Sequence, residues 1–104
     1  SIRYSAFFVF VLLNSIVQAQ NMGRIDSLKL AITKTQGEPR ARLLNQLGFQ
    51  FRTSYPDSTI YYCQEALKIS QSVENQFIKG ESLNFIGIAY SYKAMASEAA
   101  DAYA

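Results

Sequence analysis

The chain has 104 residues, of which 49% are apolar and 17% are charged, a composition that excludes a disordered chain and fits one small domain. Ten basic residues against eight acidic ones provide no basic field of the kind that binds nucleic acid. Histidine is absent, which excludes Ser-His and Cys-His catalysis and the usual zinc ligand sets. The single cysteine cannot form an internal disulfide.

The first twenty residues have the pattern of an export signal. Arg3 precedes an unbroken apolar run over residues 6–13, and Val17 and Ala19 supply the small residues that a signal peptidase needs. We therefore expect residues 1–19 to be a cleaved signal peptide. A retained N-terminal membrane anchor is the alternative, although the apolar stretch is shorter than the ~20 residues of a spanning helix.

The rest of the chain has the apolar periodicity of helices and no β-alternation. Residues on the expected inward faces recur at spacings of three and four. They are Ile25, Leu28 and Ile32; Leu43, Leu44, Leu47 and Phe51; Ile60, Cys63, Ala66, Leu67 and Val73; and Ile78, Leu83, Ile86 and Tyr90. We expect helices at about 23–35, 39–53, 57–72 and 75–94, and a fifth from Ser97 onward. The predicted fold is all-α, with antiparallel helix pairs.

Turn and capping residues separate these helices. Pro39 suits the first turn of the second helix. Asp57 is expected to cap the third helix, Asn75 or Glu74 to open the fourth, and Ser97 to cap the fifth.

Two stretches repeat each other 39 residues apart: LNQLGFQF at 44–51 and LNFIGIAY at 83–90. Each contains a glycine inside a helical pattern, where glycine costs about 1 kcal/mol relative to alanine. We expect Gly48 and Gly87 to lie where a paired helix approaches closely, facing Thr59 and Ala99 as small partners.

The repeated unit, a helix, a short turn and a second helix, resembles the tetratricopeptide repeat, whose helix pairs stack into a solenoid. The positions that match the family, and that would pack the repeats, are Leu44, Gly48, Phe51, Thr59, Cys63 and Ala66 in copy one, and Leu83, Gly87, Tyr90, Ala99 and Tyr103 in copy two. The 39-residue spacing exceeds the family's usual ~34. On this reading residues 20–37 form a leading helix and linker, and 38–104 form the repeats, at about 40–73 and 79–104, the second truncated.

The resemblance implies a concave groove, lined by the first helix of each unit, that holds a peptide or partner segment. The groove positions would be Arg42, Asn45, Phe49, Arg52, Glu81, Asn84, Ile88, Ser91 and Tyr92. Asn45 and Asn84 could hydrogen-bond an extended backbone, and Arg42 with Arg52 could attract an acidic group. The alternative for Phe49 and Ile88 is packing against a neighbouring repeat.

Enzyme signals are lacking in the sequence. It contains no Gly-rich phosphate loop and no CxxC pair. Glu98 and Asp101 suit the start of a helix, where they favour the helix dipole, and Cys63 on an apolar face reads as a buried structural thiol. We expect no catalytic residue, no metal and no cofactor.

The expected function is an exported, periplasmic or secreted bacterial scaffold for protein–protein interaction. The alternative is the periplasmic sensor region of a membrane signal transducer, a histidine kinase or DNA-binding regulator, whose output domain lies beyond residue 104. On either reading we expect the chain to be the N-terminal part of a longer protein. Its partner would be an unidentified protein or peptide. Membrane contact would come only through the signal peptide or a downstream anchor.

Overall fold

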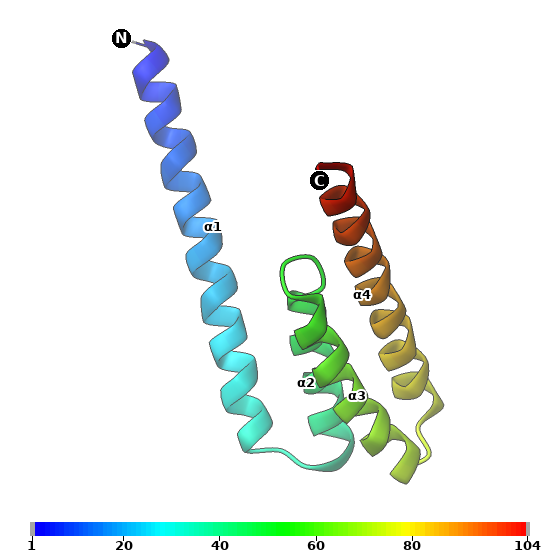
Figure 1. Ribbon diagram of the computed structural model, residues 1–104. Helices are drawn as coiled ribbons and strands as arrows, with labels where there is room; N and C mark the ends of the chain where they lie inside the picture. Colours follow the sequence, from blue (N-terminus) through cyan, green and yellow to red (C-terminus); the bar gives the residue numbers. More distant parts are fainter. Residues whose placement is uncertain (1, 104) are drawn as a thin grey trace.

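The computed structural model describes residues 2–103, which form four helices. In chain order they are α1 (Ile2–Thr33), α2 (Gly37–Gln50), α3 (Pro56–Ser72) and α4 (Gln76–Tyr103). No strand occurs over these residues, so the predicted all-α class is confirmed. Helix α3 packs against both α2 and α4, and α1 packs against α2. The N-terminal half of α1 extends away from the other three helices (Figure 1).

The connections between the helices follow from local sequence. Gly37 takes a positive φ of 64° where the chain turns from α1 into α2, a conformation that glycine adopts without a steric cost. Pro39 lies in the first turn of α2, as predicted. Asn75 caps α4, because its Oδ1 accepts a hydrogen bond from the Ile78 amide at 2.9 Å.

The predicted cap of α3 is wrong by two residues. Pro56 occupies the first helical turn, so Tyr55 is the N-cap residue and Asp57 lies inside the helix. The Asp57 carboxylate instead pairs with the Lys93 ammonium of α4 at 2.7 Å. The hydrogen bond and the charge of Asp57 raise the pKa of Lys93.

Each helix contributes one apolar face to the core. Most of the predicted inward residues are there, although Val73, Leu83 and Tyr90 are exposed. The buried apolar cluster consists of Leu28 and Ile32 from α1, Ala41, Leu44 and Leu47 from α2, Ala66 from α3 and Ile78 from α4. The core therefore holds the leading helix and the three following helices together.

Helix α1 is longer than the leading helix predicted over 23–35. It spans 32 residues and joins the apolar N-terminal segment to the amphipathic one without a break. The only glycine within it, Gly23, has no proline beside it, and a lone glycine is tolerated in a helix at about 1 kcal/mol. Within residues 2–103, no helix combines the length and the apolarity that crossing a membrane requires.

Helix α4 runs through the position where a turn and a fifth helix were predicted, so that prediction is wrong. Residues 94–103 contain alanine, methionine and glutamate and no glycine or proline, and this helix-forming composition outweighs the capping tendency of Ser97. In one continuous helix Gly87 and Ala99 lie about 18 Å apart along the axis. They therefore cannot face each other.

Candidate partner-binding groove

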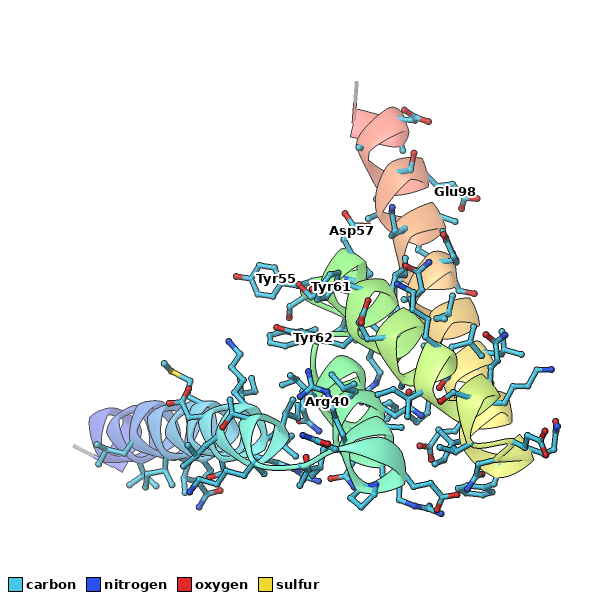
Figure 2. The ribbon with its side chains drawn as sticks, turned by 90° about the horizontal axis from the view of Figure 1, so that it is seen from below. Arg40, Tyr55, Asp57, Tyr61, Tyr62 and Glu98 are labelled. Atoms are coloured by element: carbon cyan, nitrogen blue, oxygen red, sulfur yellow. The ribbon has the colours of Figure 1, made fainter. Side chains whose placement is uncertain are left out.

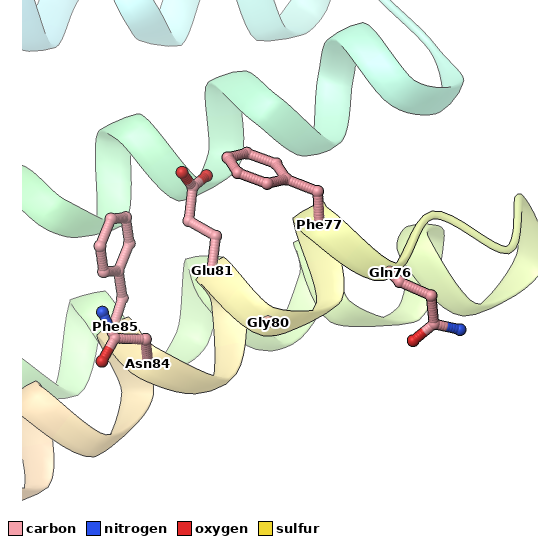
Figure 3. A pocket seen from close by; sticks show the side chains of 6 residues that line it. All are labelled: Gln76, Phe77, Gly80, Glu81, Asn84 and Phe85. Atoms are coloured by element: carbon pink, nitrogen blue, oxygen red, sulfur yellow. The ribbon is translucent and has the colours of Figure 1, made fainter.

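An open hollow lies along the N-terminal half of α4, and all of its lining residues belong to this helix. Figure 3 shows Phe77, Glu81 and Phe85 pointing from α4 toward α2, whereas Gln76 points away. The residues that line the hollow are Gln76, Phe77, Gly80, Glu81, Asn84 and Phe85. We call this hollow, with the facing surface of α2, the α2–α4 groove.

Asn45 does not lie on the open surface of this groove. It is fully buried, with its Nδ2 donating to Glu81 Oε1 at 3.1 Å and to the Ile78 carbonyl at 3.5 Å. Its Oδ1 accepts from the Ser82 hydroxyl at 2.9 Å. Asn45 was expected to face a bound segment; instead its hydrogen-bonding groups are used to join α2 to α4.

Two arginines from the α2 side lie over aromatic rings. The Arg42 guanidinium carbon is 5.8 Å from the centroid of the Phe77 ring, and that of Arg52 is 3.8 Å from the centroid of Phe49. Both distances fall within the range of cation–π attraction. Arg52 also donates to the Phe49 carbonyl at 2.9 Å, which fixes it just beyond the end of α2.

Phe49 makes the contact that was expected of it as an alternative to ligand binding. Its ring centroid lies 4.8 Å from that of Phe85 on α4, with the planes tilted by 37°. Such an offset aromatic pair contributes about 0.5–1.5 kcal/mol beyond its area burial. Phe49 therefore packs across the α2–α4 contact while remaining partly exposed.

The other predicted groove residues divide between the hollow and the rest of α4. Asn84 is exposed and lines the hollow with Glu81. Ser91 is exposed, and its hydroxyl donates to the Gly87 carbonyl at 3.1 Å. Ile88 and Tyr92 are partly buried, and neither lines the hollow.

Sequence reasoning missed four lining residues: Gln76, Phe77, Gly80 and Phe85. A signal for the two phenylalanines was available. Phe77 and Phe85 lie four positions before and after Glu81, which was predicted, so all three share one face of a helix.

The first copy of the repeated motif forms a close contact between α2 and α3. A Cβ atom added at Gly48 would lie 2.7 Å from Cys63 Sγ and 3.2 Å from the Thr59 carbonyl oxygen. Thr59 is fully buried, and its hydroxyl donates to the Gly48 carbonyl. Leu44 is 4% exposed, and Ala66 is buried on the facing side of α3.

Aromatic side chains continue this contact beyond Gly48. The ring of Phe51 stacks on that of Tyr62 at 6.0 Å between centroids and meets Tyr55 edge-on at 6.2 Å. Tyr55, Tyr61 and Tyr62 gather on the side of α3 where α1 lies (Figure 2).

The second copy of the motif makes no such contact. Leu83 and Tyr90 are 49% and 53% exposed, and a Cβ atom at Gly87 would meet nothing within 4 Å. Ala99 is exposed as well, and the side chain of Tyr103 lies outside the described residues. Leu83, Gly87, Tyr90 and Ala99, which were expected to pack the second repeat, are therefore not packed in this chain.

Cys63 is completely buried at the contact with Gly48. Burial, and to a lesser degree the negative charge of Glu81, raise the pKa of the Cys63 thiol to about 12. The thiol therefore stays protonated at neutral pH, a state in which it is a poor nucleophile and metal ligand. Over the described residues, no cluster of three or more potential metal-ligating side chains is present.

The fold defines the class of this protein as all-α with packed helix pairs. No family model matches the chain, and it has no significant similarity to a curated protein or to a solved structure. The functional interpretation of this chain therefore rests on its own residues.

Proposed function

We propose that this chain is a scaffold of the tetratricopeptide type that binds a peptide or partner segment in the α2–α4 groove. One observation carries the proposal: an open hollow runs along α4, and three of its lining side chains, Phe77, Glu81 and Phe85, point toward α2 (Figure 3). In tetratricopeptide-like pairs, α2 and α4 would be the first helices of successive units, which is where the family resemblance puts a ligand.

The composition of the groove supports binding. Phe77 is an exposed aromatic side chain and Phe85 is partly exposed, and they flank the polar side chains of Glu81 and Asn84. Apolar surface with a few placed polar groups is typical of sites that bind ligands. Exposed phenyl rings offer the large contact area that dominates many interfaces.

Export is a separate part of the proposal and rests on the sequence of residues 1–19. A basic residue, a short apolar run and a small-residue exit describe a secretory signal. The same features led to the expectation of a periplasmic or secreted location. N-terminal sequencing of the exported protein should give a chain that begins at Gln20. A chain that retains residues 3–19 in the membrane fraction would contradict cleavage.

Two glycines of α4 provide a matched test of the groove. A Cβ atom added at Gly80 or at Gly87 meets no atom within 4 Å, and both positions are exposed, so we choose them for the introduction of tryptophan. Gly80 lines the groove and Gly87 does not. Peptides selected from a random display library for binding to this chain should lose binding to Gly80→Trp by about tenfold or more, as expected when an anchor contact is blocked. They should bind Gly87→Trp normally.

Circular dichroism melts of both variants check that the fold is kept. Equal binding to both variants, or a selection that enriches no peptide above an unrelated helical protein, would refute the groove as a binding site. Loss of binding to Gly87→Trp alone would move the site about two turns toward the C-terminus of α4, because Gly80 and Gly87 lie on the same face of this helix.

A further inference from the structure

We propose that the α2–α4 groove takes an extended acidic segment, with two carboxylate side chains on either side of an apolar residue. This inference rests on the proposed function and names the chemistry of the partner. It follows from the two arginines at the groove, from their spacing and from what lies between them.

The two arginines carry charge that the chain itself does not neutralise. The ion pairs found over the described residues are Lys68–Glu65 and Lys93–Asp57. Arg42 is exposed and Arg52 is partly exposed, and neither takes part in those pairs. The Arg52 guanidinium carbon lies close to a phenyl ring, at 3.8 Å from its centroid, and that of Arg42 lies farther away, at 5.8 Å. A contact with a ring leaves N–H groups of the guanidinium free to donate to a carboxylate in bidentate fashion.

The rings make each arginine a better recognition group than a free surface arginine. Stacking restricts the side chain before a ligand arrives, so less conformational entropy is lost on binding. The Arg52 hydrogen bond to the Phe49 carbonyl adds to this restriction. The Arg52 guanidinium group is therefore partly positioned for an incoming acid, and the exposed Arg42 is restricted less.

The spacing of the arginines sets the spacing of the acids. The rings beside the arginines give this spacing: Phe77, near Arg42, and Phe85, which pairs with the ring under Arg52, are eight positions apart on α4, or about 12 Å at 1.5 Å per residue. An extended segment rises about 3.3 Å per residue. The two carboxylates should therefore be about four positions apart, a spacing that also places them on the same side of an extended segment.

The groove between the arginines selects against a third acid. The exposed Phe77 ring at the Arg42 end and the partly exposed Phe85 ring at the Arg52 end offer apolar surface along it. The Glu81 carboxylate lies on the same side of α4, held by Asn45 at 3.1 Å. An acidic residue beside Glu81 would be repelled, whereas an apolar residue would cover the rings. The preferred order is acidic, apolar, acidic.

Three synthetic peptides test this order by fluorescence anisotropy on the whole chain. The first has two glutamates about four positions apart with a central leucine. The second replaces both glutamates by glutamine, and the third has the same composition with the two glutamates adjacent. We expect the first peptide to bind at least about tenfold more tightly than the other two, since a bidentate pair is geometrically specific.

Charge variants on two surfaces provide the control. The double variant Arg42→Gln, Arg52→Gln should lose at least about tenfold in affinity for the first peptide. Arg24→Gln, Lys29→Gln removes the same charge from exposed positions of α1 and should change the affinity by less than about twofold, as expected for a remote surface charge. If the double variant melts at a lower temperature, the affinity is measured with Arg42→Gln alone, because Arg42 is the more exposed of the two arginines.

Four outcomes would overturn the inference. They are no binding of the first peptide, equal binding of the glutamate and glutamine peptides, an equal loss in the two double variants, or equal competition by a single-stranded oligonucleotide. If the glutamine peptide binds as well as the first and Gly80→Trp blocks both, the groove is a binding site without acid preference. In that case the proposed function stands and this inference fails.

Discussion

The repeated motif occurs on two helices, and it is packed on one and exposed on the other. On α2 and at its C-cap, the residues Leu44, Gly48 and Phe51, here the α2 stripe, lie under α3. On α4, the corresponding Leu83, Gly87 and Tyr90, here the α4 stripe, lie open. Leu44 is 4% exposed and Leu83 is 49% exposed. A Cβ atom at Gly48 would collide with the Cys63 sulfur, while one at Gly87 would meet nothing.

The contrast shows that the motif alone does not produce helix packing. It provides a helix face that becomes buried only where a second helix covers it. Helix α3 covers the α2 stripe because the chain reverses at Pro56 and brings Thr59 and Cys63 against Gly48. The α4 stripe has the corresponding residues, but the chain does not reverse after it, since α4 continues to Tyr103. Three matched substitutions on the two helices test this contrast.

The largest expected difference is between the two leucines at equivalent positions. Leu44→Ala should lower the free energy of unfolding by about 2–5 kcal/mol, because it removes buried methyl groups and leaves a cavity. Leu83→Ala, on the open stripe, should change it by less than about 1 kcal/mol, as for a half-exposed side chain. Urea unfolding followed by circular dichroism measures both values. A comparable loss for Leu83→Ala would mean that another surface covers the α4 stripe.

The next largest difference in stability is expected between alanine variants of the two asparagines of the motif. Asn45→Ala removes a fully buried side chain and its hydrogen bonds to Ser82, Glu81 and the Ile78 carbonyl, at an expected cost of about 1–3 kcal/mol. Asn84→Ala, at an exposed position of the groove, should leave stability within about 0.5 kcal/mol of the parent chain. Thermal melts of the single variants decide this. Unchanged melting of Asn45→Ala would contradict its role as a link between α2 and α4.

Much of the fold could be predicted from the sequence, because local signals determine it. The spacing of Leu28 and Ile32, Pro39 at the start of α2 and the Asn75 cap each depend on nearby residues alone. The continuity of α4 could not be predicted, because Ser97 is a capping residue whose effect depends on the helix-forming residues around it.

The candidate site was only partly predictable, because burial depends on which helices meet. Asn45 and Asn84 occupy the same position of the motif, yet one is buried under α4 and the other lines the hollow. No pattern within either copy distinguishes them. Likewise, the placing of Arg42 over Phe77 joins residues of two helices and becomes visible only when α2 and α4 lie side by side.

The most direct test is a comparison of melting temperatures between Gly48→Ala and Gly87→Ala in the 104-residue chain. Gly48→Ala should melt at a lower temperature, since the new methyl group overpacks the contact with Cys63 and Thr59 at a cost of about 1–3 kcal/mol. Gly87→Ala should melt at a higher temperature, because alanine in an uncovered helix is favoured over glycine by about 0.8–1 kcal/mol. Opposite signs are thus the predicted result. A lower melting temperature for Gly87→Ala would contradict it and show that the α4 stripe is covered in solution.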